Sequence, residues 1–577
     1  MEKSKSVHDF WLGENKMKRF PLTLIAALIT PSVFANDADL IFTNADVITV
    51  TGENARAQAV AIKDGNIVAV GSNQDILKQK GKETHVRDLQ GKTLAPGFID
   101  SHGHFAQYLP LIESEFLYPA PMGSTNSIED IRTQMTRYFT QPNLDKDILH
   151  VAFGYDDAEL NEKRHPSKEE LDQFTGDYNF CAVHISGHLA TCNSKGLEFI
   201  GYTKQTPNPE GGVIRRDGNG EMTGVLEESA VYAILGNLPE MTQQDAIRRF
   251  GKVQDMYASY GITTTQEGLA TMPALRAMKT MAENDLMKID LLAYAKWVDL
   301  EEAIELMPMK STINGFTLAG VKMVGDGSPQ GKTAYLSTPY YEPPHSHAYD
   351  YHGYPVLNQE EMNHWVETAY KMNAQILSHS NGDASADILL NAVERADEKL
   401  GKEDRRTVVI HAQTTRLDQV KRMKKNEMIP SFFPAHTYFW GDFHKSSVLG
   451  PWRASNISPM GWANSNDLMF TIHMDAPVLF PDMMTNMWSA VNRVTRSGET
   501  LGEHHKITPY QALEAVTINA AYQNFEETTK GTIEVGKRAD FVVLDSNPLE
   551  VAPSDINQIQ VLETIKDGKT VFQRNQG

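Results

Sequence analysis

Alternating apolar and polar residues mark both ends of the chain beyond its first 35 residues. Residues 38–75 alternate in this way and carry a tight-turn signal at Asp64-Gly65, which predicts short antiparallel strands. The segments "ADFVVLDSNP" and "VLETIKDGKTVFQ" near the C-terminus have the same pattern, with a second "IKDG" at Ile565 to Gly568. The matching ends predict one small β-sandwich built from residues 36–93 and 529–577. Two separate groups of terminal strands are the alternative.

The middle of the chain, residues 94–528, alternates short β-branched runs with longer runs of helical periodicity. This pattern is typical of βα units and a parallel sheet. Eight runs are candidate strands, the number that a closed (β/α)8 TIM barrel requires. They are "FIDSH", "CAVHISGH", "GITTTQE", "GVKMVGDG", "AQILSHS", "VVIHAQ", "MIPSFFPAH" and "FTIHMDAP". Connections at about 106–177 and 191–250 exceed ordinary loops, and predict an inserted subdomain or lid over the barrel mouth.

The first 35 residues have the composition of a signal peptide. A cationic "MKRF" precedes the apolar run "PLTLIAALITPSVFA", and "NDAD" follows as a polar start for the mature chain. We expect cleavage after Ala35 and a periplasmic or secreted protein. An uncleaved anchor or a disordered tail is the alternative, although Pro31 interrupts the apolar run and makes it a poor membrane span.

Charge and cysteine content narrow the function classes. The chain has 54 Lys and Arg against 74 Asp and Glu, and its net charge of -20 argues against nucleic acid and, after signal cleavage, against a membrane as a partner. Export permits a disulfide between Cys181 and Cys192, but two buried free thiols fit the sequence equally well. No CxxC motif is present, so a thiolate zinc site is excluded. The sequence leaves homo-oligomerisation open.

Residues able to bind a metal recur at the ends of the candidate strands, where a barrel of this kind assembles its active site. His102 and His104 follow the first strand, and alternate residues of a strand point to the same face. The other strand-end residues are Lys322, His379, His411 and Asp475. A single buried His or surface Asp is usually an ordinary structural residue, but repetition at five strand ends predicts a metal site. Imidazoles and a carboxylate suit zinc and similar divalent ions.

Lys322 is the unusual member of this set. A protonated ammonium has no lone pair and repels a cation. Reaction of the amine with carbon dioxide would convert it into an anionic carbamate that is able to bridge two metals.

Motifs along nearly the whole mature chain identify a family resemblance. They are "GFIDSHGH", "SGHLATCNSKGLE", "GGVIRRDGNGEMTGVLEE", "GITTTQE", "VKMVGDGS", "HSNGDASAD", "VIHAQ", "HMDAPV" and "TINAAYQNFEETTKGTIEVGKRADFVVLD". In this order they resemble the amidohydrolase superfamily and, within it, the amidohydrolase 3 (YtcJ-like) subgroup, which is related to N-substituted formamide deformylases. The last motif is typical of the return of the chain from the barrel to the β-sandwich.

The resemblance implies a metal-dependent hydrolase that uses one or two divalent ions, zinc above all. His102, His104 and Asp475 would hold one ion, His379 and His411 the other, and carboxylated Lys322 would bridge them; some relatives keep one ion only. A metal-activated hydroxide would attack the carbonyl of a small-molecule amide, N-acyl or N-formyl substrate. Asp475 would pass the proton to the leaving nitrogen.

Two positions depart from the family pattern. The usual small or hydroxyl residue before the strand-eight Asp is here Met474, preceded by His473. Relatives often place an acid just before the strand-six His, whereas this chain has "VIHAQ", which leaves the orientation of His411 to an unidentified partner.

Other residues and functions stay open at this level. His188 and His436 follow candidate strands two and seven, and each is either a substrate contact or a residue that hydrogen-bonds a loop. Glu267 points toward the site but is not needed as a ligand. The alternative functions are hydrolysis of an ester or lactone, deamination at the same site, and a periplasmic binding or regulatory protein without turnover.

Overall fold

A parallel sheet forms the centre of the fold, and its strands follow the order β8-β15-β16-β18-β19-β20-β21-β22. The hydroxyl of Ser101, after β8, donates to the carbonyl of Ile472 in β22 at 3.0 Å, so the first and last strands lie side by side. The predicted (β/α)8 barrel is therefore confirmed. The strands are β8 (Phe98–Ile99), β15 (Ile262–Ala270), β16 (Asp290–Lys296), β18 (Phe316–Val324), β19 (Gln375–Ser380), β20 (Val408–His411), β21 (Ile429–Phe432) and β22 (Thr471–Ile472), with the short β17 (Thr312–Ile313) beside β18.

This computed structural model describes residues 37–575, apart from positions 121, 158, 188, 210–211, 240–241 and 345–348. The predicted signal peptide with its cleavage site, and His188, lie outside the described residues. Within those residues, no helix has the length and apolar character needed to cross a membrane.

The second barrel strand differs from the prediction. "CAVHISGH" does not enter the barrel: its residues form β11 (Asn179–His184) in a separate sheet, where β11 pairs with β10 (Leu149–Tyr155) and β12 (Leu189–Cys192). The barrel strand that completes the eight is instead β16, "DLLAYAK", which pairs in parallel with β15 and β18. A short apolar run such as LLAYA fits a buried strand and a buried helix equally well, so only its pairing identifies it.

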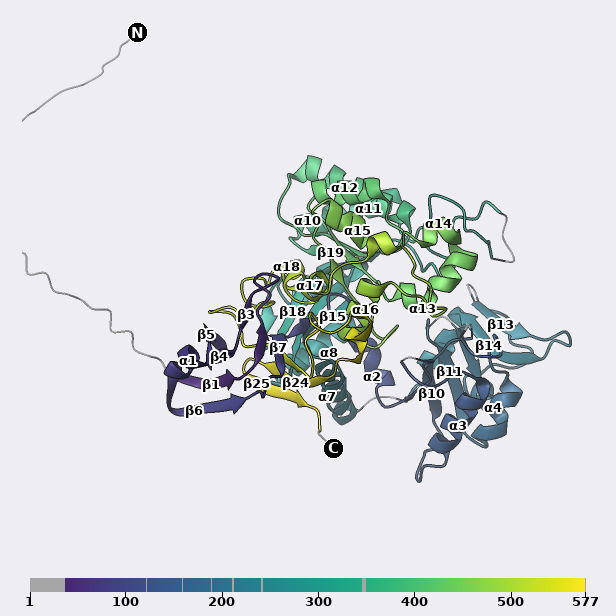
Figure 1. Ribbon diagram of the computed structural model, residues 1–577. Coiled ribbons are helices and arrows are strands. Elements are labelled where there is room, and N and C mark those ends of the chain that lie inside the picture. The colour runs from purple at the N-terminus through teal and green to yellow at the C-terminus, as the bar shows by residue number, and fades with distance from the viewer. Residues whose placement is uncertain are drawn as a thin grey trace, which may run out of the picture. The chain divides into compact units, whose positions relative to one another are not determined.

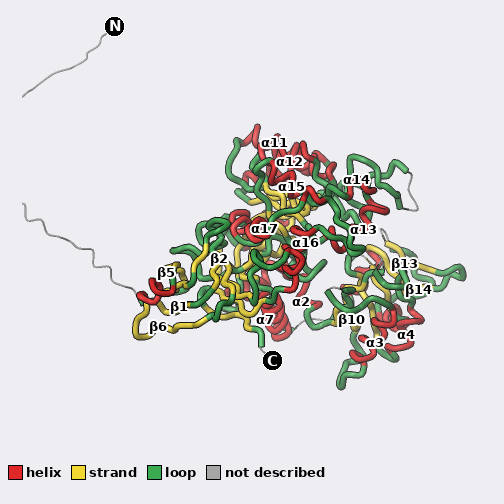
Figure 2. The backbone as a smooth tube through the Cα atoms, viewed as in Figure 1, coloured by secondary structure: helices red, strands yellow, loops and turns green. Residues whose placement is uncertain are grey.

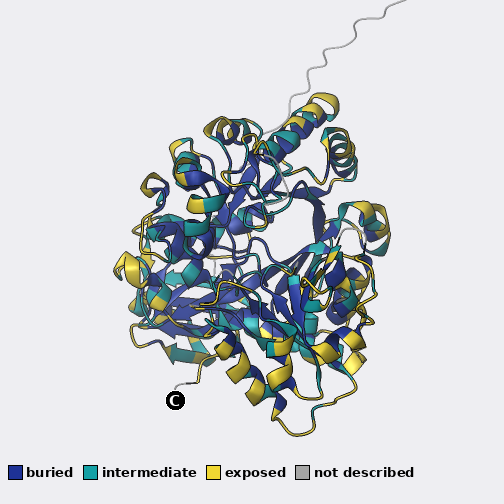
Figure 3. Cartoon of the chain, turned by 90° about the vertical axis from the view of Figure 1, so that its right-hand side faces the viewer, coloured by how far each residue is buried: buried dark blue, intermediate teal, exposed yellow. Residues whose placement is uncertain are grey.

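Helices between the strands cover the barrel. In α7 (Gln243–Ser259), the hydroxyl of Thr242 caps the first turn, and the buried Phe250, Val253 and Tyr257 recur at helical spacing on the face toward the main core. The other helices around the barrel are α8 (Met272–Glu283), α9 (Leu300–Leu306), α10 (Gln359–Lys371), α11 (Asp383–Leu400), α12 (Leu417–Lys425), α16 (Met483–Asn492), α17 (Pro509–Ala515) and α18 (Ile518–Gln523). Figure 2 shows them by secondary structure, and Figure 3 shows the buried strands inside them.

An inserted sheet lies between β8 and β15 in the sequence, with strand order β13-β14-β12-β11-β10-β9 (Figure 1). Its remaining elements are β9 (Glu115–Phe116), β13 (Gly212–Arg216), β14 (Met222–Glu228), α3 (Ile128–Phe139), α4 (Lys168–Thr175) and α5 (Ser194–Phe199). Cys181 and Cys192 lie opposite each other on β11 and β12 and form a disulfide, which decides between the two alternatives left open by the sequence. Tyr118 donates to the carbonyl of Pro477, after β22, at 2.7 Å, so the insertion contacts the carboxyl end of the barrel.

The two ends of the chain form the predicted β-sandwich. One sheet has the order β5-β4-β1-β6, and the other has the order β25-β24-β23-β7-β2-β3. In the second sheet, β7 pairs antiparallel with β23, so that Pro96 lies opposite Phe541. Apolar residues of both sheets share one core, in which Phe42 contacts Phe541 edge to face. The strands are β1 (Ala38–Thr43), β2 (Asp46–Ile48), β3 (Arg56–Ala57), β4 (Ala59–Lys63), β5 (Asn66–Gly71), β6 (Lys80–Asp88), β7 (Thr93–Pro96), β23 (Phe541–Leu544), β24 (Val561–Lys566) and β25 (Lys569–Gln573).

Candidate metal centre

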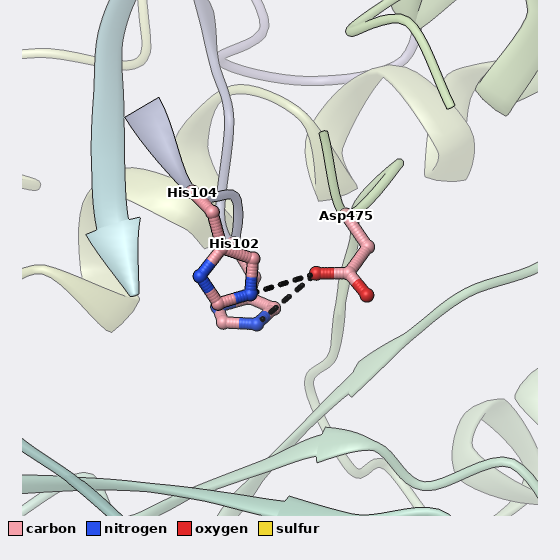
Figure 4. Close-up of side chains that lie close together, drawn as sticks. All are labelled: His102, His104 and Asp475. Carbon is pink, nitrogen blue, oxygen red and sulfur yellow. Dashed lines mark ion pairs between the residues drawn. The ribbon is translucent and has the colours of Figure 1, made fainter. Parts of the chain in front are cut away.

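His102, His104 and Asp475 meet at the carboxyl end of the barrel. The two histidines follow β8, and Asp475 follows the neighbouring strand β22. Asp475 Oδ1 lies 3.4 Å from His102 Nε2 and 3.3 Å from His104 Nε2 (Figure 4). Three ligands at about 2.0–2.2 Å from a tetrahedral zinc ion stand about 3.3 Å from one another. The spacing of these atoms therefore fits ligands of one cation better than direct hydrogen bonds, which are about 2.9 Å long.

The electrostatic environment of Asp475 also fits a cation. Burial alone raises the pKa of this carboxyl, but its interactions with His411, His104 and His102 outweigh burial and hold the pKa well below its usual value. The anionic Oδ1 is nevertheless buried without a hydrogen-bond partner. The residue has a left-handed backbone with φ of 54°, a strain of about 1–3 kcal/mol for a residue other than glycine, and such strain clusters at functional sites.

Lys322 lies against His102, one of the two histidines that follow β8. Its side chain, on β18, is buried, and Nζ is 2.8 Å from His102 Nε2. Among the described residues, no carboxylate oxygen lies within 4 Å of Lys322 Nζ, and the nearby Asp475 pairs with the histidines instead. Burial lowers the pKa of Lys322 to about 7. The lysine therefore lacks the charge partner that a buried ammonium ordinarily has.

His379 and His411 complete the cluster from β19 and β20. His411 Nε2 is 3.1 Å from His379 Nδ1 and 3.9 Å from Asp475 Oδ2. Burial, together with the charge of Lys322, lowers the pKa of His379 to about 4, and burial lowers that of His411 well below its usual value. Both rings are therefore neutral at pH 7 and have a lone pair for a metal. All six residues predicted as ligands are thus brought together, and their role as ligands stays a prediction.

His473 is the partner of His411 that the sequence left unidentified. It lies just after β22 and is fully buried. Its Nε2 atom is 3.1 Å from His411 Nδ1, and its Nδ1 atom is 2.9 Å from the hydroxyl of Ser431 in β21. The sequence marked His473 only as a departure from the family pattern before Asp475. Its contact with His411 joins the ends of β22 and β20, and the sequence alone does not show that these two side chains meet.

Glu267 supports the loop that carries His104. Its carboxylate accepts hydrogen bonds from the backbone N–H of Ala106 at 2.6 Å and of Leu269 at 3.1 Å. Glu267 Oε1 is 3.9 Å from His104 Nδ1. It therefore lies beside the candidate ligands and anchors their backbone, in keeping with the expectation that it is not needed as a ligand.

His436 lies in an aromatic group beside the site. It begins α13 (His436–Phe443), is buried, and contacts Phe433 and Trp440 with ring centroids 4.6 Å away. Its Nδ1 atom is 3.1 Å from His444 Nε2. His444 therefore provides a partner for Nδ1 of His436, and a contact of His436 with substrate stays a prediction. His188, the other weaker candidate, is outside the described residues.

A second group with the composition of a metal site occurs in the inserted sheet, where Asp156, Asp157 and His184 lie together. His184 Nε2 is 3.5 Å from Asp156 Oδ1 and 3.2 Å from Asp157 Oδ1. His184 Nδ1 lies 2.8 Å from the hydroxyl of Ser186, and although burial lowers the pKa of the ring, the carboxylates of Asp156 and Asp157 outweigh it and raise the pKa to about 9. A ring protonated on both nitrogens has no lone pair for a cation, so we interpret the group as an ion-paired triad.

Comparison with known proteins adds a family to this geometry. The sequence profile of the amidohydrolase family matches residues 85–572. The N-substituted formamide deformylase of Arthrobacter pascens is 25% identical over 547 residues, which are 93% of this chain and 98% of that protein. The putative amidohydrolase YtcJ of Bacillus subtilis is 26% identical and covers 92% of this chain and 98% of its own length.

A solved structure shares the fold. The uncharacterized metal-dependent hydrolase from Pyrococcus horikoshii OT3 superposes with a TM-score of 0.71 at 23% sequence identity, covering 89% of this chain and 99% of that one. The likeness extends over barrel and sandwich together.

Proposed function

Because the chain belongs to the amidohydrolase family, we propose that it is a metal-dependent hydrolase of carbon–nitrogen bonds other than peptide bonds, acting on a small amide, N-acyl or N-formyl compound. The observation that carries the proposal is that the anionic Asp475 lies within 3.9 Å of three histidine rings at the barrel mouth, one of which, His102, also contacts Lys322. The likeness to the Arthrobacter N-substituted formamide deformylase supports the choice of a carbon–nitrogen bond.

In this proposal His102, His104 and Asp475 hold one divalent ion, and His379 and His411 hold a second. When bound, zinc supplies a Lewis acid for the substrate carbonyl and lowers the pKa of a bound water to about 7. Asp475 accepts the proton of the attacking water and donates it to the leaving nitrogen, a role worth roughly a hundred- to ten-thousand-fold in rate. Its ionised state and its position between the two histidine groups support this role.

In this proposal Lys322, converted into a carbamate, would help to hold the two ions. The Nζ atom forms a bond to the carbon of carbon dioxide and releases a proton, which turns a neutral amine into an anion with two oxygens. The buried position of Nζ beside His102, without a carboxylate partner among the described residues, supports the modification, because the new anion would balance the cations. A metal-loaded crystal structure with unmodified Lys322 would contradict it.

We further propose that the protein works in the periplasm or outside the cell. The predicted signal peptide supports this location, and so does the disulfide between Cys181 and Cys192, since disulfides persist in oxidising compartments. Fractionation of cells that express the full chain, with N-terminal sequencing of the exported form, tests the location. A chain that stays in the cytoplasm with residues 1–35 attached would contradict it.

The decisive experiment measures turnover in metal-depleted and zinc-reconstituted protein. The substrate panel contains N-formyl amines, N-acyl amines and simple amides, with esters, lactones and aminopurines as separate arms, and Asp475→Asn is the comparison variant. We expect zinc-dependent release of an amine by the wild type. Turnover confined to esters, lactones or aminopurines would reject the carbon–nitrogen hydrolase of this proposal. Metal binding without any turnover would favour a binding or regulatory protein.

A further inference from the structure

A chain of hydrogen bonds runs from His411 into the interior of the barrel. His411 Nδ1 is 3.1 Å from His473 Nε2, and His473 Nδ1 is 2.9 Å from Ser431 Oγ. Ser431 Oγ is 3.3 Å from Ser101 Oγ, which donates to the carbonyl oxygen of Ile472 at 3.0 Å. His473, Ser431 and Ser101 have no exposed surface. The chain therefore links four side chains and ends on a backbone atom.

The terminal carbonyl gives this chain a direction. A carbonyl oxygen only accepts, so the single hydroxyl proton of Ser101 points to Ile472. Ser101 can then only accept from Ser431, and Ser431 in turn accepts from His473. The ring proton of His473 is thus on Nδ1, and its Nε2 lone pair accepts the Nδ1 proton of His411. In this order every contact contains one proton, and Nε2 of His411 carries the lone pair.

The reverse order leaves one contact without a proton. If Ser431 donated to His473 Nδ1, the proton of His473 would be on Nε2 and that of His411 on Nε2 as well, facing the metal centre. The oxygens of Ser431 and Ser101 would then stand 3.3 Å apart with no hydrogen between them. Because both hydroxyls are fully buried, solvent cannot supply the missing donor.

His379 has no such constraint. Its Nε2 atom lies 3.0 Å from the amide nitrogen of Asn381, a donor, and 3.1 Å from the carbonyl of Gly327, an acceptor. It can therefore accept from Asn381 while its Nδ1 proton is donated to His411 Nε2, or donate to Gly327 and leave Nδ1 free for a cation. The two facing histidines thus differ. His379 is able to change tautomer between the metal-free and the metal-bound protein, whereas His411 keeps one tautomer in both.

We propose that His473 is a positioning residue, which locks His411 in the tautomer that presents the Nε2 lone pair to the metal centre, through a one-way chain ending at Ile472. The proposal rests on the proposed function, because it assigns the lock to a metal ligand. It gives a role to the histidine that departs from the family pattern. It also predicts that the site is preorganised before metal arrives.

The first test measures the tautomers in metal-free protein. Histidine labelled with ¹⁵N, with Ser431→Ala and His473→Gln used to assign the signals, gives separate shifts for protonated and unprotonated ring nitrogens. We expect His473 and His411 both to carry the proton on Nδ1 and not on Nε2. A proton on Nε2 of His473 would overturn the proposal.

The second test measures zinc affinity and stoichiometry by competition with a chelator. We expect Ser431→Ala and His473→Phe to weaken zinc binding about 10- to 100-fold, the usual effect of removing a partner behind a metal ligand. His473→Gln keeps an acceptor near His411 Nδ1 and is expected to lose less than His473→Phe. Ser489→Ala, at a buried serine of α16 whose hydroxyl has no hydrogen-bond partner, is the matched control and should bind zinc as the wild type does.

The outcomes separate this inference from the proposed function. Unchanged affinity and stoichiometry in both Ser431→Ala and His473→Phe would overturn the lock while leaving the metal site intact. A wild-type protein that binds no zinc would overturn the proposed function, and the tautomers of the metal-free protein would still decide the direction of the chain. Ser431→Ala removes a single oxygen, so a folding failure of His473→Phe does not end the test.

Discussion

The two ends of the barrel handle buried charge in opposite ways. At the carboxyl end, Asp475 Oδ1 is buried without a hydrogen-bond partner, and Lys322 contacts a histidine in place of a carboxylate. At the amino end, Asp290 begins β16 and meets Lys530 at 2.5 Å, Lys566 at 3.1 Å and Arg538 at 3.2 Å. Burial alone would raise the pKa of Asp290, but these three cations lower it below its usual range.

The difference indicates that the amino end of the barrel contributes to stability, whereas the carboxyl end has groups that are available for binding. Lys530 and Lys566 come from the C-terminal segment, and Lys566 also pairs with Asp540 at 3.0 Å, so the ionic group at the amino end joins barrel and sandwich. Its charges compensate one another within the protein. At the carboxyl end, Asp475 Oδ1 has no hydrogen-bond partner among the described residues, and in the proposed function a divalent cation would balance its charge. The following predictions test this contrast with the same type of substitution at each end.

Asp475→Asn is expected to have the largest effect. It removes the group that accepts and returns the proton, so kcat should fall about a hundred- to ten-thousand-fold. The metal-free protein should unfold more easily, because the attraction between the carboxylate and the surrounding histidines is lost, but by less than in Asp290→Asn, because Oδ1 has no hydrogen-bond partner to leave unpaired. Steady-state kinetics and urea unfolding measure the two quantities. A variant with normal kcat would remove Asp475 from the proposed chemistry.

Asp290→Asn should have the reverse profile. It leaves two buried lysines and an arginine short of their shared carboxylate, and we expect unfolding to become easier by about 3–5 kcal/mol. Its kcat at 25 °C, measured on the folded protein, should stay at the wild-type value. If Asp475→Asn destabilised the metal-free protein as much as Asp290→Asn does, the contrast between the two ends would be wrong.

Removal of the metal tests the carboxyl end of the barrel through the stability of the protein. Zinc at a hundred times its Kd should stabilise the folded protein by about 2.7 kcal/mol, since the ion binds the folded state only. Thermal unfolding with and without a chelator measures the shift. The shift should be the same in Asp290→Asn and should disappear in His102→Asn. An equal shift in His102→Asn would place the ion elsewhere.

Acid should weaken the amino end by a smaller, graded amount. Because the folded-state pKa of Asp290 is below its unfolded value of about 3.9, its contribution is fully present above that value and is lost as pH falls toward the folded pKa. Each unit of difference is worth about 1.4 kcal/mol. Urea unfolding of wild type and Asp290→Asn between pH 6 and pH 2.5 should show the gap between them narrowing as pH falls. A gap that widens in acid would contradict the assignment.

The candidate site was predictable because its chemistry is repeated along the chain. His102, His379 and His411 each end a short apolar run, and parallel strands bring such ends to one place. The same pattern misled the assignment of one strand: "CAVHISGH" is also an apolar run with a histidine, yet β11 belongs to the inserted sheet. β16 was missed for the opposite reason, since "DLLAYAK" carries no metal-binding side chain, and pairing with its neighbours alone defines it.

The hydrogen-bond chain behind His411 was beyond the sequence. Ser101, Ser431 and His473 come from three separate strand ends, and each serine taken alone is an ordinary polar residue. Their effect on the tautomer of His411 requires that the side chains lie within hydrogen-bond distance of one another. It also requires that the chain end on a carbonyl oxygen, which only accepts. Such order appears only when side chains from distant segments are placed together.

The pairing of β7 with β23 has a consequence for biosynthesis. Because Pro96 lies opposite Phe541, a nascent chain has made its whole barrel before the second sheet of the sandwich receives β23. Until then β7 has an open edge, to which other chains can add. Ribosomal stalling or proteolysis anywhere before residue 541 would therefore leave an aggregation-prone fragment and not a smaller folded protein. The last strands of the chain complete the sheet and cover this edge.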